Sequence, residues 1–86
     1  MNQIIEVIRQ SAINHTILRI MYTEKEGTSE GWRYVEPYSF RGEAENKALF
    51  AWDVHKGGIR RFTLVRINQA EITLENFNPR YPNEII

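Results

Sequence analysis

The sequence predicts a mainly β domain in which one N-terminal helix is followed by a small barrel of five short, strongly bent strands. Three observations predict this fold. Apolar residues three or four apart occur only near the N-terminus, five later segments alternate apolar with polar residues, and turn residues fill the gaps between them. The 86 residues fit one domain. We expect a helix over 1–14, the barrel over 15–75 and an irregular tail over 76–86.

The helix is predicted over residues 2–13, where the apolar spacing forms one face. Asn14 and His15 should end it, because asparagine suits the left-handed position that follows a helix C-terminus. About three helical turns are marginal in isolation, so the apolar face should dock on the strands. That face consists of Ile4, Ile5, Ile8 and Ala12.

Two strands should follow the helix. Residues 16–23 are apolar on both faces, which suits a strand that lies between the helix and a core. The charged stretch 24–31 carries two glycines and should be a loop. Residues 32–40 form the second strand, and Pro37 within it marks an edge, a bulge or a bend because proline cannot donate a ladder hydrogen bond. A bent strand favours closure of a small barrel.

The remaining strands are separated by shorter turns. The third is predicted over residues 48–55, and Lys56-Gly57-Gly58 should form the tight hairpin that leads into the fourth. The fourth strand runs through residue 67 and the fifth over 70–75, where apolar residues alternate with polar ones. The tail carries two prolines and should be irregular.

The fourth strand is the basic part of the chain. Residues 54–70 contain four of the 11 lysines and arginines and none of the 11 acids, so seven bases face 11 acids elsewhere. Such segregation within a chain of zero net charge points to an anionic partner. The four bases are Lys56, Arg60, Arg61 and Arg66.

Side-chain direction in this strand selects two of the arginines, because residues two apart share a face of a sheet. The shared face would hold Arg60, Phe62, Leu64 and Arg66. Arg60 and Arg66 would then lie at the two ends of an apolar face. Three explanations stay open: the guanidinium groups emerge at the rims, carboxylates pair with them, or they bind a ligand's phosphate or carboxylate. Arg61 faces the other side, where solvent exposure is the ordinary explanation, and as part of the basic strand it is a further candidate for ligand binding.

Composition excludes several classes of protein. The absence of cysteine rules out disulfides, and neither a signal peptide nor an apolar run of about 20 residues is present. We therefore expect a cytoplasmic protein that does not contact membranes. The serines lack a nucleophile motif, and the two histidines lie forty residues apart without a zinc-binding pattern. We expect no enzymatic activity, no cofactor and no metal site.

Aromatic residues of the second and third strands allow two interpretations. They either fill the core, as a small domain requires, or form a platform on which bases stack beside the basic strand. We expect Tyr38 and Trp52 to be exposed for stacking and the other aromatic residues to be buried.

Five segments, taken in order, resemble the WYL domain family over residues 12–80. They are LRIMY (18–22), RYVEPY (33–38), LFAWD (49–53), GIRRFTLVRI (58–67) and FNPR (77–80). The resemblance implies an Sm-like or SH3-like barrel preceded by a helix. It also implies a non-enzymatic ligand-sensing module of prokaryotic transcription regulators, sometimes CRISPR-associated, that binds a nucleotide or single-stranded nucleic acid. Arg60 and Arg66 match the family's basic ligand positions, and Arg33 matches an earlier arginine.

Two positions depart from the family pattern. The Trp-Tyr-Leu triplet that names the family aligns with Lys47-Ala48-Leu49, which keeps only the leucine. Lys47 would replace stacking with charge and favour a phosphate-rich partner, so Lys47→Ala should then weaken nucleic-acid binding. One helix is too few for a helix-turn-helix, which suggests a free-standing protein or one domain of a longer regulator. The alternative function is self-association through edge strands, with the arginines ion-paired across the interface.

Overall fold

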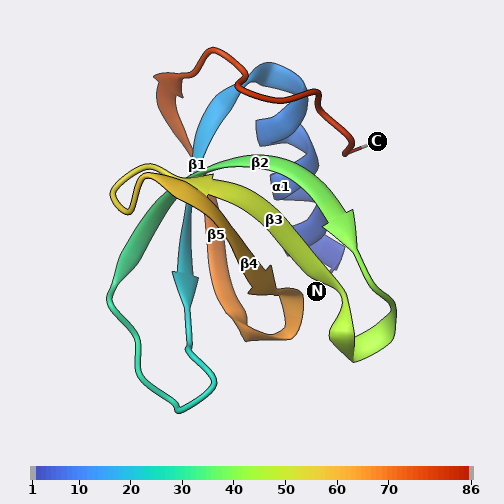
Figure 1. The fold of residues 1–86 in the computed structure, drawn as a ribbon, viewed down its shortest axis with the longest axis vertical. Helices are drawn as coiled ribbons and strands as arrows, with labels where there is room; N and C mark the ends of the chain where they lie inside the picture. Colours follow the sequence, from blue (N-terminus) through green and yellow to red (C-terminus); the bar gives the residue numbers. More distant parts are fainter. Residues whose placement is uncertain (1, 86) are drawn as a thin grey trace.

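The computed structural model describes residues 2–85, which form one helix and one five-stranded antiparallel sheet (Figure 1). The prediction of a mainly β domain with an N-terminal helix is confirmed. Two short 3-10 turns, η1 (Ala44–Asn46) and η2 (Leu64–Arg66), connect strands. The larger elements are α1 (Asn2–Asn14), β1 (Thr16–Tyr22), β2 (Trp32–Arg41), β3 (Ala48–Asp53), β4 (Gly58–Thr63) and β5 (Ile67–Asn76).

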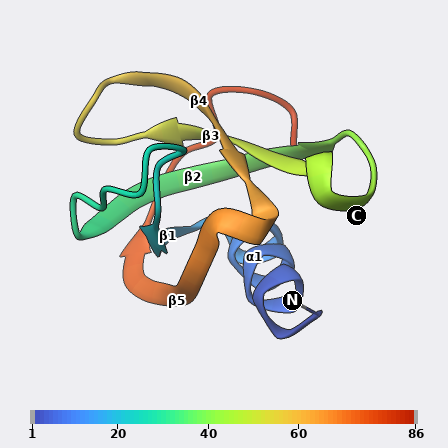
Figure 2. The same ribbon diagram turned by 90° about the horizontal axis from the view of Figure 1, so that it is seen from below.

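The sheet is strongly curved but is not closed into a barrel. Its strand order is β4-β3-β2-β1-β5, so β4 and β5 are the two edges and no ladder joins them. Figure 2 shows the curved sheet with α1 against its concave side. The five-stranded Sm-like or SH3-like barrel expected over 15–75 was therefore wrong as to closure. Strand β4 pairs with β3 and β5 pairs with β1, and η2 connects these two edge strands.

Helix α1 covers the concave face as its apolar spacing predicts. Ile8 and Ala12 are fully buried in one cluster with Leu18 of β1 and Phe62 of β4. The docking of the helix on the strands is thus confirmed, and most of its stability comes from this packing. The left-handed residue that ends the helix is His15, with a φ of 54°, one residue later than asparagine preference suggests.

The irregularity at Pro37 is a bulge inside the sheet. Strand β2 lies between β1 and β3, so it is not an edge strand. The register with β3 shifts between Pro37, which is opposite Ala51, and Ser39, which is opposite Phe50. Because proline has no N–H to donate, the ladder tolerates it only where pairing is interrupted. Among the predicted alternatives, the structure selects the bulge.

The basic strand is shorter than predicted. Strand β4 ends at Thr63, and Leu64–Arg66 form the 3-10 turn η2. Arg66 therefore does not share a strand face with Arg60, and that prediction was wrong. The turn keeps Leu64 in the core while its N–H donates to the Lys47 carbonyl oxygen at 2.9 Å. The burial of Leu64, two positions after Phe62, is compatible with this turn and with a continued strand, so the sequence pattern did not distinguish them.

The C-terminal segment 77–85 has no helix or strand, as predicted, but it is fixed to the rest of the domain. Ile85 belongs to the core cluster, and the Glu84 N–H donates to the Tyr38 carbonyl oxygen at 2.8 Å. The Phe77 N–H donates to the His15 carbonyl oxygen at 2.9 Å. This segment, which we call the tail, covers part of the convex side of β2 and β3, the outer face of the sheet.

Candidate ligand-binding cleft

A cleft of about 490 Å³ lies between the β1–β2 loop, η1 and the end of β4. Three cationic side chains from separate segments line it: Lys25 from the loop, Arg61 from β4 and Arg66 from η2. Tyr22 and Asn46 add polar groups to the wall. These three charges come together because the β1–β2 loop and η2 lie beside the end of β4, and not because they share one face of one strand.

The two arginines of the cleft bond only to neutral acceptors. Arg61 donates from Nη1 to Thr63 Oγ1 at 3.1 Å and from Nη2 to the Asn46 carbonyl oxygen at 2.9 Å. Arg66 Nη1 donates to the Glu24 carbonyl oxygen at 3.4 Å. Within residues 2–85 neither arginine has a carboxylate partner. Both guanidinium groups are held in place with their positive charge uncompensated.

Two acidic residues also line the cleft, but only one of them retains an unpaired charge. The Glu24 carboxylate bonds to Arg33 Nη1 at 2.5 Å, so its charge is already compensated. Glu45 is exposed at the rim. Three cations then face one unpaired carboxylate, and the cleft favours an anion.

Arg33 supports the cleft from inside the protein. Its side chain is 5% exposed, and its Nη2 lies 3.3 Å from Oδ2 of Asp53, which is 2% exposed. The guanidinium carbon lies 5.0 Å from the ring centroid of Phe62. The protein's own carboxylates, from Glu24 and Asp53, thus already compensate the charge of Arg33.

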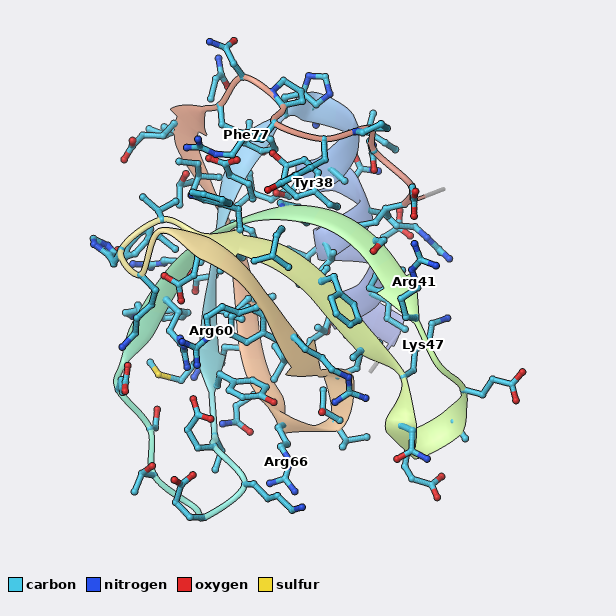
Figure 3. All side chains as sticks on the ribbon, in the orientation of Figure 1. Tyr38, Arg41, Lys47, Arg60, Arg66 and Phe77 are labelled. Carbon is cyan, nitrogen blue, oxygen red and sulfur yellow. The ribbon has the colours of Figure 1, made fainter. Side chains whose placement is uncertain are left out.

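Arg60 and Lys47 lie outside the residues that line the cleft. Arg60 is exposed opposite Ala51, and its side chain forms no hydrogen bond or ion pair with any residue in the range 2–85. The Lys47 Nζ lies 5.4 Å from the ring centroid of Phe40. Figure 3 shows Lys47 near Arg41, apart from both Arg60 and Arg66. The residues selected from the sequence therefore do not form one site, and the cleft joins Arg66 with Arg61.

Tyr38 and Trp52 lie beneath the tail on the outer face, and Tyr38 appears beside Phe77 in Figure 3. Tyr38 is buried, so the expectation that it is exposed was wrong, and Trp52 is half-buried. The Tyr38 hydroxyl donates to Glu36 Oε1 at 2.8 Å and accepts the Arg80 N–H at 2.9 Å. Burial, foremost, raises the pKa of Tyr38 to about 12, so its hydroxyl stays protonated and continues to donate.

Sequence reasoning missed Lys25 and included Arg61 among the candidate ligand residues without indicating what it would lie against. Lys25 lies in a charged loop, and nothing in the spacing of that loop indicates where its side chains point. Arg61 was assigned to solvent from strand alternation, which is correct for its exposure. Its approach to Asn46 depends on η1 lying against the end of β4, a long-range contact without a local signal.

Two further features concern metals and membranes. The residues from 2 to 85 include no group of three or more His, Cys, Asp and Glu side chains placed to hold a metal ion. In the same range, no helix combines the length and the apolar character needed to span a bilayer.

Comparison with known proteins identifies the family. None of the curated proteins matches the sequence. Among solved structures, the fold is similar to proteasome accessory factor B/C (PafBC) of Arthrobacter aurescens, with a TM-score of 0.81 and 22% sequence identity. The similarity covers 95% of this chain but 13% of that one. The WYL domain model matches residues 3–72, which is most of the sequence, and the chain therefore belongs to the WYL domain family.

Proposed function

We propose that this domain is a non-enzymatic ligand-sensing module that binds a nucleotide or single-stranded nucleic acid in the cleft of Lys25, Arg61 and Arg66. The observation that carries the proposal is the bonding of both cleft arginines to neutral acceptors alone. A planar guanidinium with free N–H groups is the usual protein partner of phosphate, because two parallel hydrogen bonds match its oxygens.

The size and composition of the cleft support a nucleotide. A volume of about 490 Å³ suits a small molecule or one part of a polymer. Tyr22, Asn46 and Thr63 supply neutral polar groups beside the cations, and these suit a sugar or a base edge. The Glu45 carboxylate at the rim disfavours a long run of phosphates at that side. Membership of the WYL family supports a regulatory role, as in the transcription regulators and CRISPR-associated proteins that the resemblance implies.

Binding should weaken about tenfold or more in each of the variants Arg61→Ala and Arg66→Ala, because one charged hydrogen bond contributes about 1.5–3 kcal/mol. We would measure fluorescence anisotropy of labelled single-stranded RNA and DNA at low and moderate salt. Affinity should fall as salt rises, because phosphate contacts release counterions. Circular dichroism and thermal unfolding would show that each variant folds.

Arg60→Ala is the matched control, since it removes the same charge one residue away on the opposite face of β4. The proposed site predicts little change in affinity for this variant. A loss as large as that of Arg66→Ala would instead make Arg60 a ligand contact, as the family resemblance implies. Absence of binding by the wild type would contradict the proposed function.

A second candidate function is self-association, which the charges of the two edge strands favour. Strand β4 carries Arg60 and Arg61, whereas β5 carries Glu75 and also Glu71, which is paired with Arg19 of β1. Each strand has one free edge, so β4 of one copy and β5 of another could pair with opposite charges alongside. Sedimentation velocity at rising protein concentration should then show oligomers that Arg61→Glu disrupts. A monomer throughout would exclude this candidate.

A further inference from the structure

A second hollow lies on the outer face of the sheet, next to the cleft. It is a mainly apolar groove of about 430 Å³ between β3, β4 and the tail. Phe50 and Ile59 form its floor with Tyr81 and Pro82 of the tail. Ile59 is 44% exposed and Tyr81 is 43% exposed, so apolar surface faces solvent in an otherwise charged region.

The groove and the cleft are joined by one row of side chains. Ile59 and Arg61 share the outer face of β4 because they are two residues apart, which is about 7 Å along a strand. The ladder with β3 places Arg61 directly opposite Phe50. Arg61 lines the cleft, whereas Phe50 and Ile59 line the groove. The Arg61 backbone thus lies beside the groove, while its guanidinium extends toward Thr63 and Asn46 on the cleft side.

The charges beside the groove are already paired. Arg41 Nη2 lies 2.7 Å from Glu84 Oε1, and both residues are at the rim. Arg61, opposite Phe50 on the same face of the sheet, has no carboxylate partner in the described range and lines the cleft. The groove thus offers an apolar and aromatic surface with a phosphate-binding group at one end.

We propose that the groove binds a nucleobase of the ligand whose phosphates lie in the cleft. This inference rests on the proposed function and specifies its ligand as a single strand of at least two nucleotides. Every base has a flat π face that packs on aromatic and apolar side chains regardless of sequence. One base would lie on Phe50, Ile59 and Tyr81 while the adjacent phosphate bonds to Arg61.

The experiment compares two probes that carry the same phosphates. One is a labelled oligothymidylate, and the other is an oligonucleotide of equal length built of abasic sites. The wild type should bind the abasic strand about fivefold or more weakly, the loss expected for one stacked base. Ile59→Thr, which keeps a β-branched residue in the strand, should lower affinity for the oligothymidylate and leave the abasic strand unaffected.

Ile13→Thr is the matched control, because Ile13 is 59% exposed on α1 and does not line the groove. This variant should keep the full difference between the two probes. Equal affinity of the wild type for both strands, or an undiminished difference in Ile59→Thr, would overturn the inference. If Arg61→Ala still weakened both probes in that case, the proposed function would stand without the groove. If the wild type bound neither strand, both proposals would fall.

Discussion

Replacing Arg33 with alanine should lower the free energy of unfolding by about 3–5 kcal/mol, because removing one partner of a buried ion pair leaves the other charge uncompensated. Asp53 is buried to the same degree as the core, and Arg33 is its charged partner. Asp53 would keep only the hydrogen bonds from the His55 and Lys56 N–H groups, at 3.1 and 3.0 Å. Urea denaturation measures the change.

Arg60→Ala serves as the control for this prediction, because Arg60 is exposed and no partner for it exists within residues 2–85. Its effect should lie within about 0.5 kcal/mol of zero. Similar stability of the two variants would refute the role assigned to Arg33. A loss of about 3–5 kcal/mol unfolds only the least stable of domains that are stable by about 5–15 kcal/mol, so any test of ligand binding by Arg33→Ala needs a parallel check of its folding.

Replacing Arg80 with alanine should destabilise the domain by about 2 kcal/mol, because the buried carboxylate of Glu36 loses its cation. Glu36 is 3% exposed and accepts from Arg80 Nε at 3.1 Å and Nη2 at 3.4 Å. The loss of stability should be smaller than that of Arg33→Ala, since the Arg80 side chain is 48% exposed and its charge is screened by solvent. The Tyr38 hydroxyl would remain as a donor to Glu36.

The same change should loosen the tail. The Arg80 guanidinium carbon lies 4.3 Å from the ring centroid of Trp52, so the variant also loses a cation–π contact. Amide exchange at Glu84, whose N–H bonds to the Tyr38 carbonyl oxygen, should become faster. Arg41→Ala removes an exposed ion pair with Glu84 and should cost under about 1 kcal/mol. Equal effects of the two variants would contradict the role of Glu36.

The sequence predicted those parts of the fold that depend on local pattern. The spacing of Ile8 and Ala12 identified the helix, and the missing N–H of Pro37 identified an irregularity that the structure shows to be a bulge. The family was recognised from segments spread along the chain, and the family model confirms it. The end of β4 was missed because Leu64 satisfies the core equally from a strand or from a turn.

The cleft was less predictable because its parts meet through long-range contacts. The family motif predicts that Arg33 contacts the ligand, yet its guanidinium is paired with Asp53, twenty residues away in sequence. Side-chain alternation predicts that Arg61 is exposed, and it is. Because η1 lies beside it, the exposed Arg61 side chain also lines a cleft. Alternation assigns a side chain to a face and does not report what else reaches that face.

The placement of Ile85 in the core has a consequence for how the domain folds. Ile8 and Ile85 belong to the same core cluster. The ladder between β1 and β5 places Arg19 opposite Glu71, which lies 52 residues later in the sequence. Contacts between distant residues close large loops, which slows folding into the millisecond-to-second range typical of such topologies. Ile85 therefore enters the core from the far end of the sequence, and a chain shortened before it would leave part of this cluster uncovered.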